Sequence, residues 1–137
     1  MVSIDTLVSS MNRPTHKELS GKLKLAKIAV AAGAINILNP IAVAADAIDL
    51  GYDVLNVKVV LMKLLNEIIP DYYAGGYPPL RSYEKRIENL DLFPFKWVSK
   101  SFGCELYFKF ALKGKQLWLV SLHEHREQKG ETQNGHD

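Results

Sequence analysis

The sequence predicts an α+β domain in which an N-terminal helical hairpin, residues 17–69, packs on a three-stranded antiparallel sheet in the C-terminal half. In the first half of the chain, apolar residues recur at steps of three and four, which is the spacing of one helix face. Between Leu106 and Leu112 apolar and polar side chains alternate instead, which is the period of a half-buried strand. The 137 residues, of which 47% are apolar, are enough for one domain with its own core.

Capping signals place the two helices of the hairpin. Thr15 and Glu18 have the spacing of a capping box and predict a helix from Lys17 to Leu38. Asn39-Pro40 then offers a cap followed by proline at the first helical position. The second helix is expected to run from there to about Ile69, with one continuous apolar stripe.

Four elements are expected after a loop rich in Gly, Pro and Tyr at residues 71–79. They are a short helix at Ser82–Leu90 and strands at Phe93–Lys100, Leu106–Leu112 and Lys115–His123. The last two strands flank Lys113-Gly114, a short polar connection with glycine that is typical of a tight hairpin. Residues 82–126 thus form the helix-plus-sheet part of the domain. A polar, disordered tail is expected at residues 128–137.

A connection at Lys113-Gly114 fixes which residues are buried. Phe110 then faces Leu117 and Phe108 faces Leu119, and Leu106 lies on the same buried face. The opposite face carries Tyr107 across from Val120, Lys109 across from Trp118, and Glu105 across from Leu122.

An exposed sheet face of this kind suits an RNA strand, because aromatic rings stack on bases and cations neutralise phosphates. The sequence predicts RNA-binding side chains at Lys96, Lys100, Tyr107, Lys109 and Trp118. A solvated or helix-covered face is the alternative.

The charge distribution and the cysteine content limit which ligands the protein can bind and which covalent or metal sites it can form. The net charge is only +2, but residues 93–116 hold five lysines and one glutamate, whereas residues 31–80 hold two lysines and five acidic residues. The positive charge therefore belongs to the predicted sheet. Cys104 is the only cysteine, so neither an intramolecular disulfide nor a multi-cysteine metal site is available.

Two features of the first half bear on membranes and secretion. Residues 1–13 lack the long apolar core of a secretory signal peptide. The longest apolar run, Leu25–Leu38, contains Lys27 and falls short of the roughly 18 to 20 residues that a membrane span needs. Membrane contact is therefore not expected. A membrane-active protein that uses residues 23–69 is kept as an alternative, because small side chains also favour helix packing in a bilayer.

The densest group of reactive side chains is His123-Glu124-His125-Arg126. Cleavage of RNA through its 2′-hydroxyl needs a base, an acid and a cation for the phosphate, and this cluster together with Lys109 offers all three. No metal and no other cofactor is expected. The alternatives are a metal edge at His123 and His125, a thiol–imidazole pair of Cys104 and His123, or merely a polar strand end.

The C-terminal half resembles a known family. A compact antiparallel sheet that ends in LWLVSLHEHRE is similar to small bacterial ribonuclease toxins of the RelE/ParE and barnase-like superfamily, over Ser82–Glu127. The resemblance implies an RNA-cleaving toxin with RNA as substrate and a cognate antitoxin or immunity protein as partner. It assigns phosphate binding to Arg126 and acid or base roles to His123 or His125. It places the protein in the cytoplasm, with delivery from another cell as a variant.

The expected function is thus a metal-independent ribonuclease. Its rival from a different class is a non-catalytic immunity or adaptor protein that binds another protein through the sheet face or the helix stripe.

Overall fold

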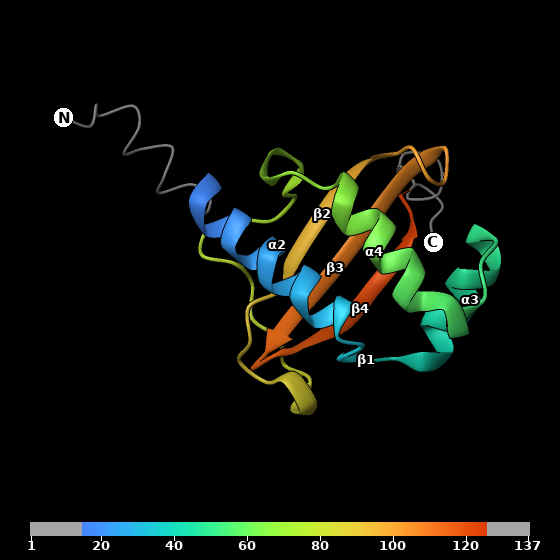
Figure 1. Cartoon of the computed structure of the whole chain (residues 1–137). Helices are drawn as coiled ribbons and strands as arrows, with labels where there is room; N and C mark the ends of the chain where they lie inside the picture. Colours follow the sequence, from blue (N-terminus) through green and yellow to red (C-terminus); the bar gives the residue numbers. More distant parts are fainter. Residues whose placement is uncertain (1–14, 126–137) are drawn as a thin grey trace, which may run out of the picture.

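The computed structural model describes residues 15–125, which form three α-helices and one mixed sheet (Figure 1). The helices are α2 (His16–Ala31), α3 (Pro40–Leu50) and α4 (Val57–Glu67), with short 3-10 turns η1 (Val54–Asn56), η2 (Pro70–Tyr72) and η3 (Lys85–Ile87). The strands are β1 (Ile35–Ile37), β2 (Phe93–Ser99), β3 (Cys104–Lys113) and β4 (Gln116–Glu124). The predicted α+β class, with helices first and the main sheet strands last, is confirmed.

The sheet differs from the prediction by one strand. Its order is β1-β4-β3-β2, and β1 runs parallel to β4 whereas the other pairs are antiparallel. The helix expected to reach Leu38 ends at Ala31, because Gly33 turns the chain in a left-handed conformation (φ 71°). Ile35–Ile37 then pairs with Leu117–Leu119, and the side chain of Asn36 donates to that of Gln116 at 2.9 Å.

The predicted second helix is two helices. Asn39 caps α3 and Pro40 is its first residue, as expected, but Gly51 ends α3 in a left-handed conformation (φ 88°). Asp53 then accepts a hydrogen bond from the backbone N–H of Leu55 at 2.9 Å, which starts η1, and α4 begins one turn later. This break separates α3, which packs beside β4, from α4, which packs against α2.

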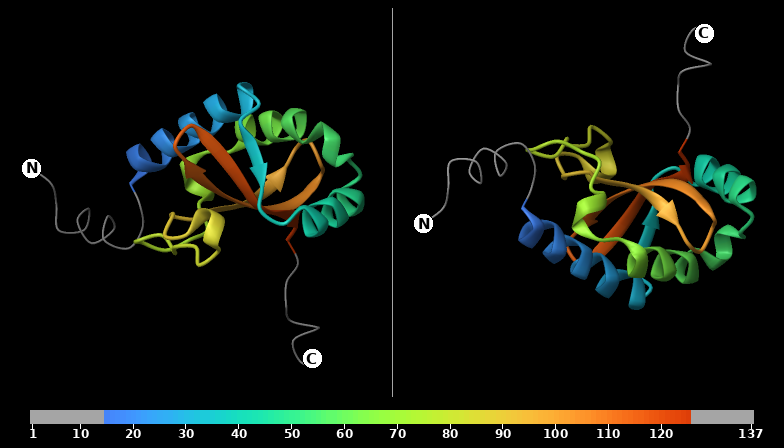
Figure 2. Two further views of the ribbon diagram at one scale, coloured as in Figure 1. Left: turned by 90° about the horizontal axis from the view of Figure 1, so that it is seen from below. Right: turned by 90° about the horizontal axis from the view of Figure 1, so that it is seen from above.

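Helices α2 and α4 cover one face of the sheet, and the main core lies between these helices and the sheet (Figure 2). We call this the inner face. The side chains predicted to be buried together, Leu106, Phe108, Phe110, Leu117 and Leu119, are all fully buried there. Leu19, Leu61, Leu64 and Leu65 of the helices pack against them, and Phe95 stacks on Phe110 with ring centroids 6.0 Å apart.

Residues 80–92 lie on the other side of the sheet, which we call the outer face (Figure 2). A helix was predicted at Ser82–Leu90, but only η3 forms. The two ends of the segment bind each other instead, because the N–H of Ser82 donates to the carbonyl of Leu90 and the N–H of Leu92 donates to that of Leu80. Ile87 of this segment packs on Ala111 and Trp118, so part of the outer face is covered.

Glu67, the last residue of α4, ties the helices to the turn between β2 and β3. Its carboxylate accepts hydrogen bonds from Trp97 Nε1 at 2.8 Å, from the N–H of Ser101 at 2.9 Å and from the Ser101 hydroxyl. Burial alone would raise the pKa of Glu67, but the hydrogen bonds from Ser101, Trp97 and Ser99 outweigh it and hold the pKa below its ordinary value.

No helix within residues 15–125 combines the length and the apolar character needed to cross a bilayer.

We expect Phe108→Ala to lower the free energy of unfolding by about 3–5 kcal/mol, because it removes a fully buried ring and leaves a cavity. Urea unfolding at neutral pH measures this loss. The control is Val98→Thr on β2, where the side chain is 70% exposed, and it should change the free energy by less than about 0.5 kcal/mol. Equal effects of the two substitutions would contradict the assignment of the inner face.

We expect Glu67→Gln to lower the free energy of unfolding by about 1 kcal/mol at pH 7. The pKa of Glu67 is lowered on folding from 4.5, so its contribution is present above pH 4.5 and disappears as the pH falls through the folded-state pKa. The difference between variant and wild type should therefore shrink in urea titrations at acid pH. Glu88→Gln, at an exposed glutamate, is the control and should change the free energy of unfolding at pH 7 by less than about 0.5 kcal/mol.

Candidate functional site

Part of the outer face lies open beside the segment 80–92, and it carries a row of polar and aromatic side chains. Lys96, Tyr107 and His123 are neighbours across β2, β3 and β4. The rings of Tyr107 and His123 stack with centroids 5.4 Å apart and planes inclined by 28°. Lys109 Nζ lies 5.9 Å from the centre of the Tyr107 ring. We call these four residues the open-face cluster.

The hairpin between β3 and β4 is shifted from the predicted register. Its two-residue connection is Gly114-Lys115, with Lys113 opposite Gln116, so Phe110 lies opposite Leu119 rather than Leu117. A shift of two residues leaves every side chain on its predicted face, because side chains alternate with a period of two.

A bulge further along β4 does change the faces. Phe110 pairs with Leu119, but Lys109 pairs with Ser121, so Val120 is an extra residue in β4. Beyond it, Leu122 lies opposite Phe108 and is fully buried on the inner face, although it was predicted opposite Glu105 on the outer one.

The same extra residue places His123 opposite Tyr107 on the outer face. In an unbroken hairpin of this register, His123 would lie opposite Leu106, on the inner face. The open-face cluster therefore depends on the bulge.

Hydrogen bonding and burial define the chemistry of the His123 and Tyr107 rings. His123 Nδ1 lies 3.0 Å from the carbonyl oxygen of Glu124, which accepts a hydrogen bond when Nδ1 carries the proton. In that tautomer Nε2 keeps a lone pair and can take a proton from a ligand. Burial raises the pKa of Tyr107, so its phenol stays protonated at neutral pH and remains a hydrogen-bond donor.

The other predicted acid–base residues lie apart from this cluster or outside the described residues. Glu124 pairs with Leu106, an inner-face residue, and its charge acts on Cys104. The backbone N–H of His125 donates to the carbonyl of Glu105 at 2.8 Å, which extends the ladder by one residue. Arg126, to which phosphate binding was assigned, lies outside the described residues, as does the tail predicted at residues 128–137.

The predicted alternative of a Cys104–His123 pair is wrong. Cys104 pairs with Ser99 on β2, and His123 lies opposite Tyr107. Burial and the nearby charge of Glu124 both raise the pKa of the Cys104 thiol, which opposes formation of a nucleophilic thiolate. Within residues 15–125, no three side chains of the types that bind metals gather into a site.

Two further predicted RNA-binding residues have different surroundings. Lys100 is exposed in the turn after β2, outside the row of the open-face cluster. Trp118 lies opposite Ala111 in the covered part of the outer face. The guanidinium of Arg86 is 5.7 Å and Lys113 Nζ is 6.0 Å from the centre of the Trp118 ring.

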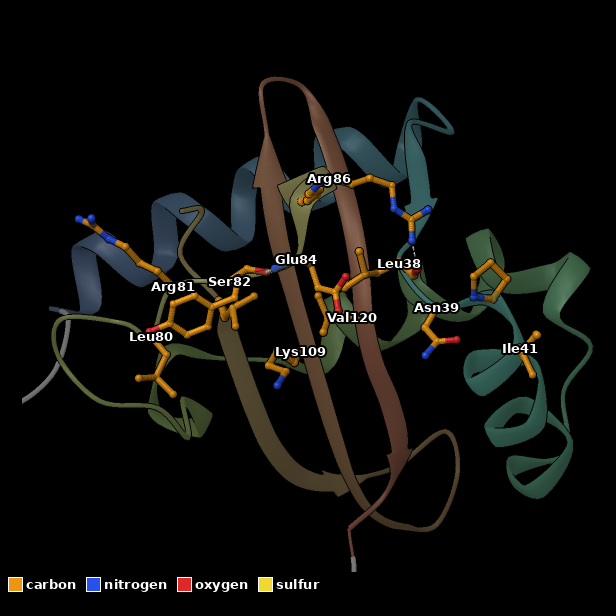
Figure 3. A pocket seen from close by; sticks show the side chains of 14 residues that line it. Leu38, Asn39, Ile41, Leu80, Arg81, Ser82, Glu84, Arg86, Lys109 and Val120 are labelled. Atoms are coloured by element: carbon orange, nitrogen blue, oxygen red, sulfur yellow. Dashed lines mark hydrogen bonds between the residues drawn. The ribbon is translucent and has the colours of Figure 1, made fainter. Parts of the chain in front are cut away.

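A groove of about 1200 Å³ lies next to the open-face cluster and was not predicted from the sequence (Figure 3). It crosses β3 and β4 between two segments, residues 80–86 on one side and residues 38–41 on the other. Lys109 and Val120 lie between them. The only sequence signal was the presence of Leu80 and Tyr83 in an otherwise polar stretch.

Comparisons with known proteins provide no family or function for this chain. No protein-family model matches the chain, and no curated protein matches it at a significant level.

We expect Leu122→Ala to lower the free energy of unfolding by about 2–5 kcal/mol, because the bulge buries this side chain in the core. The matched control is Leu80→Ala, at a leucine that is 77% exposed, and it should have little effect. Nuclear Overhauser effects between the ring protons of Tyr107 and His123 test the same bulge directly. A small effect of Leu122→Ala, with no ring contact, would mean that β3 and β4 pair without the extra residue.

Proposed function

We propose that this protein is a metal-independent ribonuclease that holds single-stranded RNA on the open-face cluster and cleaves it by acid–base chemistry. The observation that carries the proposal is the stacked pair Tyr107–His123 with Lys96 and Lys109 beside it. This combination places ring surfaces, cations and an imidazole on one face of the sheet.

The binding part of the proposal rests on ring stacking and charge. A base stacked on an aromatic side chain contributes on the order of 1–3 kcal/mol, and such contacts tolerate any base sequence. Lys96 precedes Tyr107 in the row and Lys109 lies over its ring, so both are placed to neutralise phosphates of a strand laid along the row.

The chemical part assigns the base to His123. Its Nε2 takes the proton of the 2′-hydroxyl, and the 2′-oxygen then attacks phosphorus. The bond from phosphorus to the 2′-oxygen forms while the bond to the 5′-oxygen breaks. The leaving 5′-oxygen takes a proton from Tyr107, whose raised pKa keeps the phenol protonated. Lys109 stabilises the negative charge that develops on the phosphate oxygens.

The reaction class is the one that the resemblance of the C-terminal sequence to RelE/ParE and barnase-like toxins implies. The proposal keeps His123 as the base, assigns the acid to Tyr107, and leaves Glu124 and His125 without a catalytic role. A toxin of this class would act on RNA in the cytoplasm. It would also need an antitoxin or immunity protein in the cell that makes it.

We expect His123→Asn to reduce the rate of cleavage of a single-stranded RNA oligonucleotide by about 100- to 10,000-fold, the usual effect of losing a positioned acid or base. The thermal midpoint should change little, because His123 lies outside the core. His16→Asn, on α2, is the matched control and should cleave like the wild type. EDTA should have no effect, and added salt should weaken binding.

The proposal of an enzyme would be contradicted if the pure wild-type protein cleaved no RNA at any pH between about 5 and 9. This is the range in which histidines change charge. The open-face cluster would then be assigned to protein binding, the function of the rival class.

A further inference from the structure

The groove beside the open-face cluster has an apolar floor and apolar rims. Leu38 and Val120 belong to the small apolar cluster on the outer face. The rims carry Tyr83 and Leu80 on one side and Ile41 on the other, with exposed fractions of 96%, 77% and 85%. Large apolar side chains gathered around one concave surface mark a binding site rather than the scattered exposure that is normal for a folded protein.

Cations surround this apolar surface. Arg81 lines the groove and its Nε pairs with the carboxylate of Asp91 at 3.7 Å. Lys85, Arg86 and Lys109 line the groove as well, with Glu84 as the acidic side chain among its lining residues. Within the described residues, none of these three cations forms an ion pair with a carboxylate. Arg86 is held in place, because its guanidinium donates to the carbonyl of Leu38 (Figure 3). The guanidinium also lies beside the Trp118 ring.

We propose that the groove binds a short segment of a partner protein that presents apolar side chains next to aspartate or glutamate. Apolar anchors filling a pocket supply most of the affinity at such surfaces. Carboxylates next to these anchors would find Lys85 and Lys109 within the same groove, which sets the orientation and speeds association.

A single-stranded RNA fits this surface less well. Leu38, Leu80 and Val120 offer it neither stacking planes nor hydrogen bonds, and Tyr83 is the only aromatic side chain among the lining residues. The groove is also separate from the proposed ribonuclease site except at Lys109, which borders both. Its occupant can therefore be tested without touching Tyr107 or His123.

The experiment uses a displayed library of short random peptides selected on the full-length protein. We expect the enriched peptides to combine leucine, isoleucine or phenylalanine with aspartate or glutamate. A synthetic enriched peptide should shift the methyl resonances of Leu38, Leu80 and Val120, and its affinity should fall with added salt.

Substitutions in the groove give the quantitative test. Leu80→Ser removes an apolar contact and Lys85→Glu reverses a charge that faces the peptide carboxylates. Each should weaken binding of the synthetic peptide about tenfold or more. The matched controls are Leu55→Ser, at a leucine that is 87% exposed on η1, and Lys58→Glu on α4, and both should bind like the wild type. Cleavage of RNA by all four variants should be unchanged.

Two results would overturn the proposal. One is a selected peptide that does not depend on the groove as proposed, either because it lacks acidic residues or because Leu80→Ser and Lys85→Glu leave its binding unchanged. The other is loss of oligonucleotide binding in these two variants but not in their controls, which would assign the groove to RNA. Failure of the ribonuclease assay alone leaves the peptide result standing, because that assay depends on His123.

Discussion

The outer face of this protein depends on one extra residue in a strand. Val120 has no counterpart on β3, and the two halves of β4 are therefore out of phase with each other. Burial of a leucine side chain stabilises a fold by roughly 1.5–3 kcal/mol, so Leu122 favours the bulged pairing. The unbroken pairing would bury the imidazole of His123 instead, which is costly without a hydrogen-bond partner. A requirement of the core thus decides whether His123 or Leu122 lies next to Tyr107 on the outer face.

Local patterns predicted much of the fold and explain what was missed. Alternation between Leu106 and Leu112 identified the hairpin and its buried residues. The error of two residues in register did not change which face of the sheet these side chains occupy. The bulge was not predicted, although an unbroken strand would have put Ser121 on the inner face and Leu122 on the outer one. Strand β1 was missed because Ile35–Ile37 continues the apolar spacing of α2, and its pairing with β4 depends on residues about 80 positions away. Residues 82–90 have helical spacing, but the pairing of their two ends prevents the helix.

The candidate site was predictable to the extent that it lies on one face of one hairpin. Tyr107, Lys109 and His123 were each named from the sequence, and alternation gave the first two their correct face. Glu124 was predicted beside them on the outer face, but the bulge pairs it with Leu106 of the inner face. Trp118 keeps its predicted face and lies in the part that residues 80–92 cover. The groove needs three separate segments, at residues 38–41, 80–86 and 109–120, and no pattern along the chain brings these together.

The parallel pairing of β1 with β4 has a consequence for the order of assembly. Strands β2, β3 and β4 form a meander from sequence neighbours, and such local contacts form early because little chain entropy is lost in closing short loops. Pairing of β1 with β4 requires the closure of a loop of about 80 residues, and contacts across such a separation are expected to form more slowly. Leu38 and Ile41 follow β1 closely in the chain, so one wall of the groove forms only when β1 has paired with β4. A partly unfolded chain that keeps the meander without β1 would therefore lack this wall of the groove, and a partner that binds the groove would recognise only the complete fold.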